Sequence, residues 1–278
     1  MVDITTTIKL QISSHRNPRI KHIYKLRERR TRDRCGQFII EGYRELFRAH
    51  QNNYPVTELY VCPELLAGTK EKELVNSLYE NGVDIIAVTD SVFRKLAYRE
   101  QPEGLLGIAP QKRYSLQELS FKTSSLILVA EAIEKPGNIG AMMRSADATA
   151  TDAVILCQSS TDIFNPNVVR ASTGTLFNVP VAESSNADTL EWLRQNNITT
   201  VVTLPQAGKI YSDIEMTAPL AIVVGAENCG LSDFWQQNAD AAVNIPMLGI
   251  ADSLNVNNCA TLLLYEALRQ RRGKKSNN

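Results

Sequence analysis

Short apolar runs alternate with helical patterns along the first 110 positions of this chain. The apolar runs are rich in β-branched and aromatic residues, which favours strands, and the alternation predicts a small three-layer α/β domain. A helix is expected to begin at Pro18, because proline suits the first turn. The expected strands are Gln37–Ile40, Thr57–Cys62, Val83–Val88 and Leu105–Ala109, and the expected helices are Asn17–Arg34, Glu41–His50, Lys70–Glu80 and Ser91–Ala97.

The second half of the chain carries more continuous apolar runs, again separated by helical segments. Such runs are typical of strands in a parallel sheet that is covered on both faces. They lie at Leu126–Ala130, Ala153–Cys157, Thr199–Leu204, Leu220–Val224 and Ala242–Ile245. The stretch 111–125 is polar and lacks an obvious core, so it is expected to be a linker. The sequence therefore predicts two α/β domains, residues 1–110 and residues 126–278.

Composition argues against a disordered, membrane-spanning or metal-binding protein, and the distribution of charge indicates a polyanionic partner. Hydrophobic content of 44% and charged content of 22% are ordinary for a globular chain. No apolar run is long enough to span a membrane, and five widely spaced cysteines without a CxxC pair favour a reduced, cytoplasmic protein without a bound metal. The net charge is zero, yet ten Lys and Arg residues lie between positions 9 and 34, against Glu28 and Asp33. Such clustering attracts polyanions, although a basic helix face is by itself often only solvated.

Three glycine- and asparagine-rich segments of the second half occur in a fixed order: NIGAMMR (Asn138–Arg144), GAENCG (Gly225–Gly230) and IPMLGIADSLNV (Ile245–Val256). Together they resemble the SpoU (TrmH-type) family of RNA ribose 2′-O-methyltransferases, in the knotted SPOUT superfamily. The resemblance covers about Leu126 to Arg272. It implies a methyltransferase domain with a trefoil knot, S-adenosylmethionine as cofactor and a homodimer with shared active sites.

The resemblance also implies roles for particular residues. Arg144 is expected beside the ribose hydroxyl, either as proton acceptor or as an orienting group, and the alternative is an ion pair with Glu131 or Glu134. The wider catalytic set is expected to comprise Asn138, Arg144, Glu227, Ser253 and Asn255. The expected cofactor-binding residues are Thr203, Leu204, Gly225, Ala226, Ile245, Met247 and Leu254.

Two local expectations accompany these roles. Gly225 should let the backbone approach the ligand closely. Ser253 should cap the amino terminus of the last helix, which is expected to run to about Gln270. The apolar face of this helix, Ala260, Leu263, Leu264 and Ala267, is expected to pack in the core or in a dimer interface.

The amino-terminal half carries a second, weaker resemblance. The segment FIIEGYRELFRA (Phe38–Ala49) resembles the RNA-binding domain that many SpoU enzymes carry in front of the methyltransferase domain. Residues 1–110 are therefore expected to bind the RNA substrate. Basic residues before this segment, and one between the first two motifs of the second half, are expected to contact RNA: Arg16, Arg19, Lys21, Arg29, Arg30, Arg32 and Arg170.

The sequence leaves three alternatives to an rRNA methyltransferase. A tRNA 2′-O-methyltransferase shares the motifs, but the two-domain layout favours ribosomal RNA. A non-catalytic RNA-binding protein on the same fold is disfavoured because all five catalytic candidates are present together. A dinucleotide oxidoreductase is more distant, since no GxGxxG segment follows the first strand of the second half.

Overall fold

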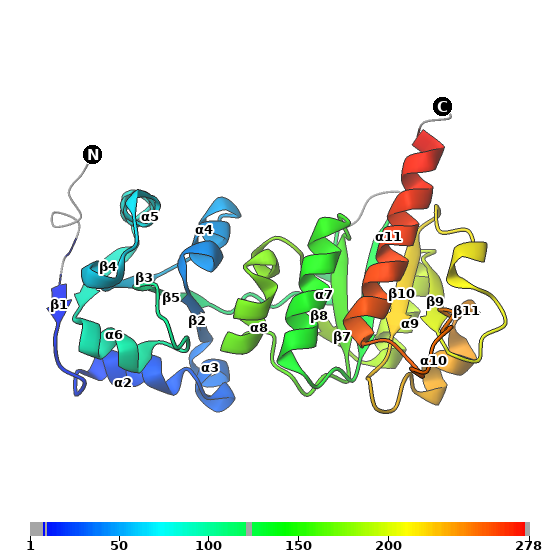
Figure 1. The fold of residues 1–278 in the computed structure, drawn as a ribbon, viewed down its shortest axis with the longest axis horizontal. Helices are drawn as coiled ribbons and strands as arrows, with labels where there is room; N and C mark the ends of the chain where they lie inside the picture. The colour runs from blue at the N-terminus through cyan, green and yellow to red at the C-terminus, as the bar shows by residue number, and fades with distance from the viewer. Residues whose placement is uncertain (1–7, 9, 121–123, 276–278) are drawn as a thin grey trace. The chain divides into compact units, whose positions relative to one another are not determined.

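The computed structural model describes residue 8, residues 10–120 and residues 124–275. The chain divides into two compact units, each described here by itself. Unit 1 comprises Met1–Lys112 and Asp162–Asn178, and unit 2 comprises Arg113–Thr161 and Val179–Asn278. Figure 1 shows the elements of both units. Within the described residues, no helix has both the length and the apolar character needed to cross a membrane.

Unit 1 is built on a mixed five-stranded sheet. The strand order is β1-β4-β3-β5-β2, and β5 runs antiparallel to both of its neighbours. The strands are β1 (Leu10–Ile12), β2 (Gln37–Glu41), β3 (Glu58–Val61), β4 (Asp84–Val88) and β5 (Leu105–Pro110). The helices are α2 (Pro18–Lys25), α3 (Arg29–Cys35), α4 (Tyr43–Gln51), α5 (Thr69–Glu80), α6 (Asp90–Leu96) and α8 (Pro166–Ser172), with 3-10 turns at η1 (Pro63–Leu65) and η3 (Thr175–Phe177). The predicted strands are all present, and β1 is additional.

The basic helix expected over Asn17–Arg34 is two helices, because the chain breaks between α2 and α3. Glu28 has extended backbone angles, φ −86° and ψ 129°, which no helix interior allows. The break leaves the carbonyls of Leu26 and Arg27 unpaired by helix bonds. Arg32 donates from Nη1 to both, at 2.9 and 2.7 Å. The prediction of one continuous helix was wrong, since periodicity alone does not reveal this side-chain capping of a turn.

A segment from the second half of the sequence completes unit 1. Helix α8 packs against β2, and Phe38 of β2 lies between two aromatic rings of the segment, with centroids 4.7 Å from Phe164 and 6.3 Å from Phe177. Asp162 forms a buried ion pair with Arg32. By its contacts, Asp162–Asn178 therefore belongs with unit 1, a feature that the predicted domain bounds did not anticipate.

Unit 2 contains a six-stranded sheet in which every pairing is parallel, as the sequence predicted. The strand order is β11-β9-β10-β6-β7-β8. The strands are β6 (Leu126–Glu131), β7 (Ala153–Cys157), β8 (Val181–Ser184), β9 (Thr199–Thr203), β10 (Leu220–Val224) and β11 (Ala241–Val243). The sequence did not predict β8, because its four residues include only two apolar side chains.

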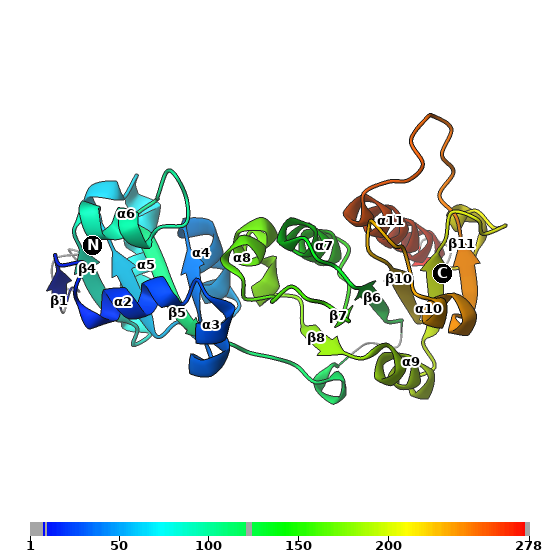
Figure 2. The same cartoon turned by 90° about the horizontal axis from the view of Figure 1, so that it is seen from below.

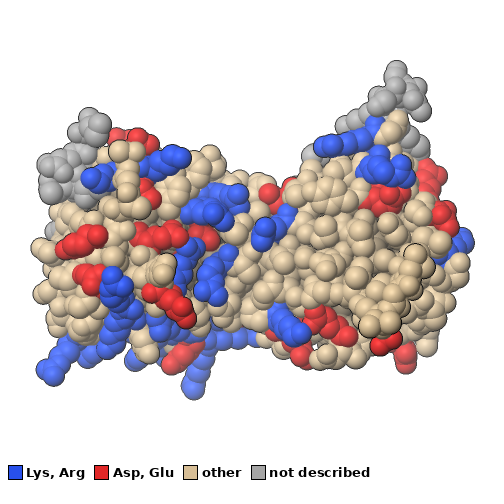
Figure 3. Space-filling view, in the orientation of Figure 1, with Lys and Arg blue, Asp and Glu red and all other residues tan. Residues whose placement is uncertain are grey.

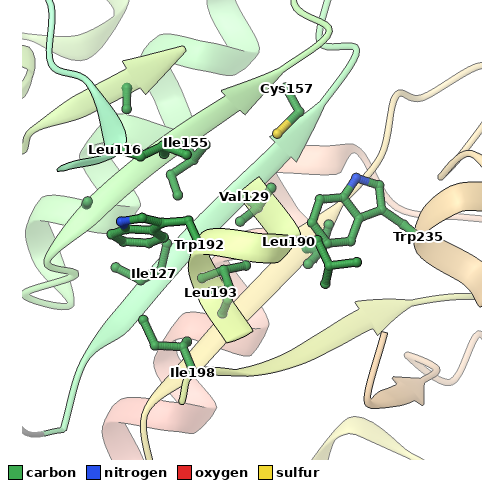
Figure 4. Packing of buried hydrophobic residues seen from close by; sticks show 14 of the residues in the cluster. Leu116, Ile127, Val129, Ile155, Cys157, Leu190, Trp192, Leu193, Ile198 and Trp235 are labelled. Carbon is green, nitrogen blue, oxygen red and sulfur yellow. The ribbon is translucent and has the colours of Figure 1, made fainter. Parts of the chain in front are cut away.

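Helices cover both faces of this sheet. Helices α7 (Pro136–Ala148) and α11 (Val256–Lys275) lie side by side on one face, and α9 (Asn186–Gln195) and α10 (Asp233–Asn238) lie on the other (Figure 2). A short turn, η4 (Tyr211–Asp213), follows β9. Between the sheet and α9 and α10 lies a buried cluster that contains two tryptophans, Trp192 and Trp235 (Figure 4).

Two predictions about unit 2 change in the structure. The 3-10 turn η2 (Leu116–Glu118) buries Leu116 and Leu119 in the cluster of Trp192, so part of the expected linker belongs to the core. Residues 121–123 of that linker lie outside the described residues. The apolar face of α11, with Ala260, Leu263, Leu264 and Ala267, is fully buried within the chain. That face is core packing and is not available to a second subunit.

Candidate functional site

A cavity of about 410 Å³ opens at the carboxyl ends of β9, β10 and β11. These strands are neighbours, and the loops that follow them meet at one edge of the sheet. The walls include every residue predicted to bind the cofactor: Thr203, Leu204, Gly225, Ala226, Ile245, Met247 and Leu254. Ligands of open α/β sheets bind at this edge, and the volume falls in the usual range for small-molecule sites.

The GAENCG loop closes on its own backbone. The N–H of Gly230 donates to the carbonyl of Ala226 at 2.9 Å, and Gly230 takes the left-handed conformation, φ +67°. A Cβ atom on Gly225 would collide with the backbone of Gly230 and Leu231. The close approach to a ligand that was expected at Gly225 stays a prediction, and the structure adds a second need for glycine there. The loop itself requires the glycine.

Beside the cavity, polar side chains of all three motifs meet. Asn255 Nδ2 donates to Glu227 Oε1 and, at 3.3 Å, to Asn138 Oδ1. Lys135 Nζ forms an ion pair with Glu227 Oε2. Hydrogen bonds from Lys135 first, and then from Asn138 and Asn255, hold the pKa of Glu227 below its ordinary value. The ionised carboxylate of Glu227 thus holds the side chain of Asn255, which in turn contacts Asn138 beside the cavity.

Helix α11 begins later than the sequence predicted. The helix starts at Val256, and Asn255 Oδ1 accepts the backbone N–H of Asn257 at 3.0 Å. Asn255 therefore provides the amino-terminal cap, and the capping role expected of Ser253 is wrong. Ser253 instead lies in the loop before the helix and lines the cavity.

Glu131, the last residue of β6, supports the site through buried hydrogen bonds. Its buried carboxylate accepts the backbone N–H of Ser232 at 2.8 Å, the hydroxyl of Ser232 at 2.6 Å and the side-chain amide of Asn186. It thereby ties Ser232, two residues past the GAENCG loop, to β6 and α9. The sequence suggested Glu131 only as an ion-pair partner for Arg144. Its position at a strand end next to the first motif was the available signal for this role.

Arg144 lies apart from these groups. It is exposed on α7, makes no hydrogen bond or ion pair with any described residue, and is absent from the cavity wall. Six residues of helix place it roughly 9 Å along the axis from Asn138 and about 120° away around it. The proposed ion pair with Glu131 or Glu134 is therefore wrong. Within one chain, Arg144 does not reach the site that Asn138 helps to form.

The cavity suits an adenosyl-methionine molecule in its chemistry. Leu204, Met247 and Leu254 supply apolar walls of the kind that flat heterocycles need, and Met is a pliable packing surface. Thr203, Ser253 and Asp252 add hydroxyl and carboxylate groups to the same wall. Among the described residues, no cluster of His, Cys, Asp or Glu has the arrangement of a metal site, and none of the five cysteines forms a disulfide.

Unit 1 carries the basic residues that the sequence assigned to RNA. Arg16, Arg19, Lys21, Arg29, Arg30 and Arg170 are exposed. Figure 3 shows Lys and Arg side chains gathered along α2 and α3. Arg32 is the exception, because its side chain is 1% exposed and bound to Asp162. The prediction that Arg32 contacts RNA is wrong, since a buried, fully paired guanidinium cannot reach a phosphate.

Comparison with known proteins agrees with this site. Residues 125–265 match the SpoU rRNA Methylase family, and residues 17–107 match the MRM3-like substrate binding domain. A 23S rRNA (uridine(2479)-2′-O)-methyltransferase from Streptomyces viridochromogenes is 30% identical over 253 residues, which cover 88% of this chain and 87% of that protein. The chain belongs to the SpoU rRNA methylase family.

Solved structures extend the similarity to the whole fold. The crystal structure of an RNA 2′-O ribose methyltransferase is 40% identical, with a TM-score of 0.83 over 94% of this chain and 99% of that chain. The SpoU methyltransferase AviRb from Streptomyces viridochromogenes, in complex with the cofactor AdoMet, is 29% identical, with a TM-score of 0.85 over 92% of this chain and 99% of that chain.

Proposed function

We propose that this protein transfers a methyl group from S-adenosylmethionine to a ribose 2′-hydroxyl of ribosomal RNA. The single observation that carries the proposal is the meeting of all seven expected cofactor residues in one cavity, next to the Asn138, Glu227 and Asn255 network. A family whose relatives include a 23S rRNA 2′-O-methyltransferase and an AdoMet-bound structure supports the cofactor and the substrate.

In this reaction the cofactor supplies an electrophilic methyl carbon. The chain's own residues hold and orient the reactants: Leu204, Met247 and Leu254 exclude water from the cavity, and Glu227 keeps Asn138 and Asn255 in place. With the cofactor bound, its methyl group would pass to the ribose 2′-oxygen, and the hydroxyl proton would leave to water or to a phosphate oxygen. The arginine guanidinium stays protonated in proteins, so Arg144 is assigned to orienting the hydroxyl.

We further propose that the active enzyme is a homodimer in which Arg144 of one subunit serves the cavity of the other. Arg144 lies outside the cavity of its own chain, so a single chain lacks one member of the catalytic set. Large apolar side chains are exposed on α11 and on the loop before it, namely Leu262, Tyr265, Leu248 and Ile250. Burial of these side chains against a second copy would favour association.

The remaining features of the proposal follow from the family. The chain path of unit 2 is proposed to form the trefoil knot of the superfamily. The non-sequential strand order agrees with such a path. Ribosomal RNA is preferred to transfer RNA because both halves of the chain match rRNA-modifying relatives. We also propose a cytoplasmic location, which is supported by relatives named as 23S rRNA methyltransferases and by the free cysteines.

The test is methyl transfer to purified, unmodified 23S rRNA with radiolabelled S-adenosylmethionine, followed by mapping of 2′-O-methyl positions. The native protein should label one position, and Arg144→Ala should reduce the rate by about 10²-fold, the usual effect of losing the orientation of a reacting group. Cofactor affinity should stay within a few-fold. Cofactor binding without methylation of any RNA would leave only a non-catalytic RNA-binding protein.

The shared site has its own test. An Arg144→Ala chain and a chain with Leu254→Asp in the cavity should each be inactive alone. Mixing the two should restore activity, because one site of the mixed dimer then combines an intact cavity with an intact arginine. Sedimentation should show a dimer at micromolar concentration. A monomer that still methylates RNA rules out this arrangement.

A further inference from the structure

Two exposed tyrosines of unit 1 share one arginine. The guanidinium carbon of Arg27 lies 4.7 Å from the ring centre of Tyr24 and 5.1 Å from the ring centre of Tyr98. Both distances are within the range of cation–π attraction. Tyr24 belongs to α2 and Tyr98 follows α6, so the contact joins two elements that are 74 residues apart in the sequence, from position 24 to position 98.

The arginine is held rigidly. Its Nη2 donates to the carbonyls of Lys95, Leu96 and Ala97, at 3.2, 3.0 and 2.6 Å, where α6 ends. Three carbonyl acceptors at a helix carboxyl terminus hold a cation firmly.

The second ring is fixed as well. The backbone N–H of Tyr98 donates to the buried carboxylate of Glu41 at 2.7 Å. Within the described part of the chain, Arg27 forms no ion pair, and its guanidinium lies close to both rings. The rings themselves stay open to solvent, since Tyr24 is 46% and Tyr98 38% exposed. Rings that served only to pack the core would be covered.

Exposed cations surround the two rings. Lys21 and Lys25 lie within one turn of Tyr24 on α2, and Lys95 lies on the last turn of α6. Arg170 of α8 lines the same small depression as Tyr98 and Arg99. Aromatic faces flanked by cations are the features that bind single-stranded nucleic acid, through base stacking and phosphate contacts.

We propose that Tyr24, Arg27 and Tyr98 form a stacking platform for an unpaired base of the RNA substrate, with Lys25 and Arg170 placed for the adjacent phosphates. The inference rests on the proposed RNA-methylating function and specifies which part of the RNA unit 1 recognises. A polarised ring attracts the π-face of any base, so the platform selects unpaired nucleotides and not a particular sequence. A fully paired duplex keeps its bases stacked internally and cannot use it.

Fluorescence anisotropy at fixed salt tests the platform on the full-length protein without cofactor. One labelled probe is an RNA hairpin with a loop of unpaired adenosines and uridines, and the other is a blunt RNA duplex of equal length. The double variant Tyr24→Leu, Tyr98→Leu should bind the hairpin about 5- to 100-fold more weakly, the effect of losing a stacked base. Duplex affinity and the salt dependence of both probes should stay the same.

Two variants control for folding and for general surface effects. Tyr24→Phe, Tyr98→Phe keeps both rings and should bind the hairpin like the native protein. Tyr79→Leu removes a tyrosine of α5 that is as exposed as Tyr98 and has no arginine on its ring, and should change neither probe. Thermal melting of the leucine variant should show that unit 1 still folds.

Unchanged hairpin affinity in a folded leucine variant overturns the platform, as does an equal loss for hairpin and duplex. Neither result touches the proposed methyl transfer, which is read from 23S rRNA labelling. Conversely, a native protein that prefers the hairpin but methylates no RNA would retain the platform and remove the enzyme. The two proposals therefore fail separately.

Discussion

Arg32 and Asp162 form an ion pair that joins positions 130 residues apart, with Nη2 and Oδ2 at 2.7 Å and both side chains at most 2% exposed. The remaining groups of the pair are also satisfied. Asp162 Oδ1 accepts the N–H of Phe164, and Arg32 Nη1 donates to two carbonyls of the turn between α2 and α3. The pair therefore fastens the segment Asp162–Asn178 to the amino-terminal elements of unit 1.

Removal of one partner should destabilise the protein strongly. Arg32→Met leaves an uncompensated carboxylate in the interior, which typically costs about 3–5 kcal/mol of unfolding free energy. Denaturant unfolding measures this loss, and Arg30→Met, an exposed neighbour on the same helix, is the matched control with little expected change. The double variant Arg32→Met, Asp162→Leu should recover part of the loss. A small effect of Arg32→Met alone would show that the pair is not structurally important.

Gly225→Ala should disrupt the GAENCG loop. The added Cβ meets the backbone of Gly230 and Leu231, so the loop has to open, at a cost of about 1–3 kcal/mol. Calorimetry should show weaker S-adenosylmethionine binding together with a lower melting temperature. Gly208→Ala is the control, since the space around that position is open. Weak cofactor binding at unchanged stability would mean that the alanine blocks the ligand directly.

The titration of Glu227 should depend on Lys135. Because Lys135 is the largest cause of its lowered pKa, Glu227 stays ionised through the ordinary titration range of glutamate, and its network is lost only when the pH falls through the lowered value. Lys135→Met should raise the Glu227 pKa toward the ordinary value, so the network is lost at a higher pH. Carboxyl NMR shifts of Glu227 measure both curves. Superimposable curves would show that Lys135 does not control this carboxylate.

Exposed cations of α2 and α3 should set the salt dependence of RNA binding. Reversing Lys21 and Arg30 to glutamate should weaken RNA binding and reduce the slope of log affinity against log salt by roughly one to two units. Each phosphate contact that is lost lowers the number of counterions released on binding. Lys72→Glu on α5, also exposed, is the control. Turnover at saturating RNA should persist. An unchanged slope would mean that α2 and α3 do not contact phosphates.

The sequence predicted the features that local chemistry determines. Continuous apolar runs indicated a parallel sheet, and the family resemblance implied the residues that line one cavity, from Thr203 to Leu254. Predictions failed where a distant residue decides the outcome. Arg32 looked like its exposed neighbours because its partner, Asp162, lies far along the chain, and the start of α11 depended on the side chain of Asn255.

Residue roles that depend on a reaction or on a partner stay predictions. The position of Arg144 on an exposed face of α7 follows from helix geometry, but its contribution to catalysis is measured only with RNA present. Glu131 shows the opposite case. Its hydrogen bonds to Ser232 and Asn186 are visible in the fold, yet no spacing in the sequence pairs these positions.

The composition of unit 1 from two stretches of chain has a consequence for biosynthesis. During translation, residues 1–112 leave the ribosome before Asp162–Asn178 has been made. Until then Arg32 has no carboxylate and Phe38 lacks the rings of Phe164 and Phe177. Domains otherwise tend to fold in order as they emerge. In this protein, unit 1 can complete its fold only after β6 and β7 of unit 2 have been synthesised. Until then, the nascent amino-terminal half remains incompletely folded.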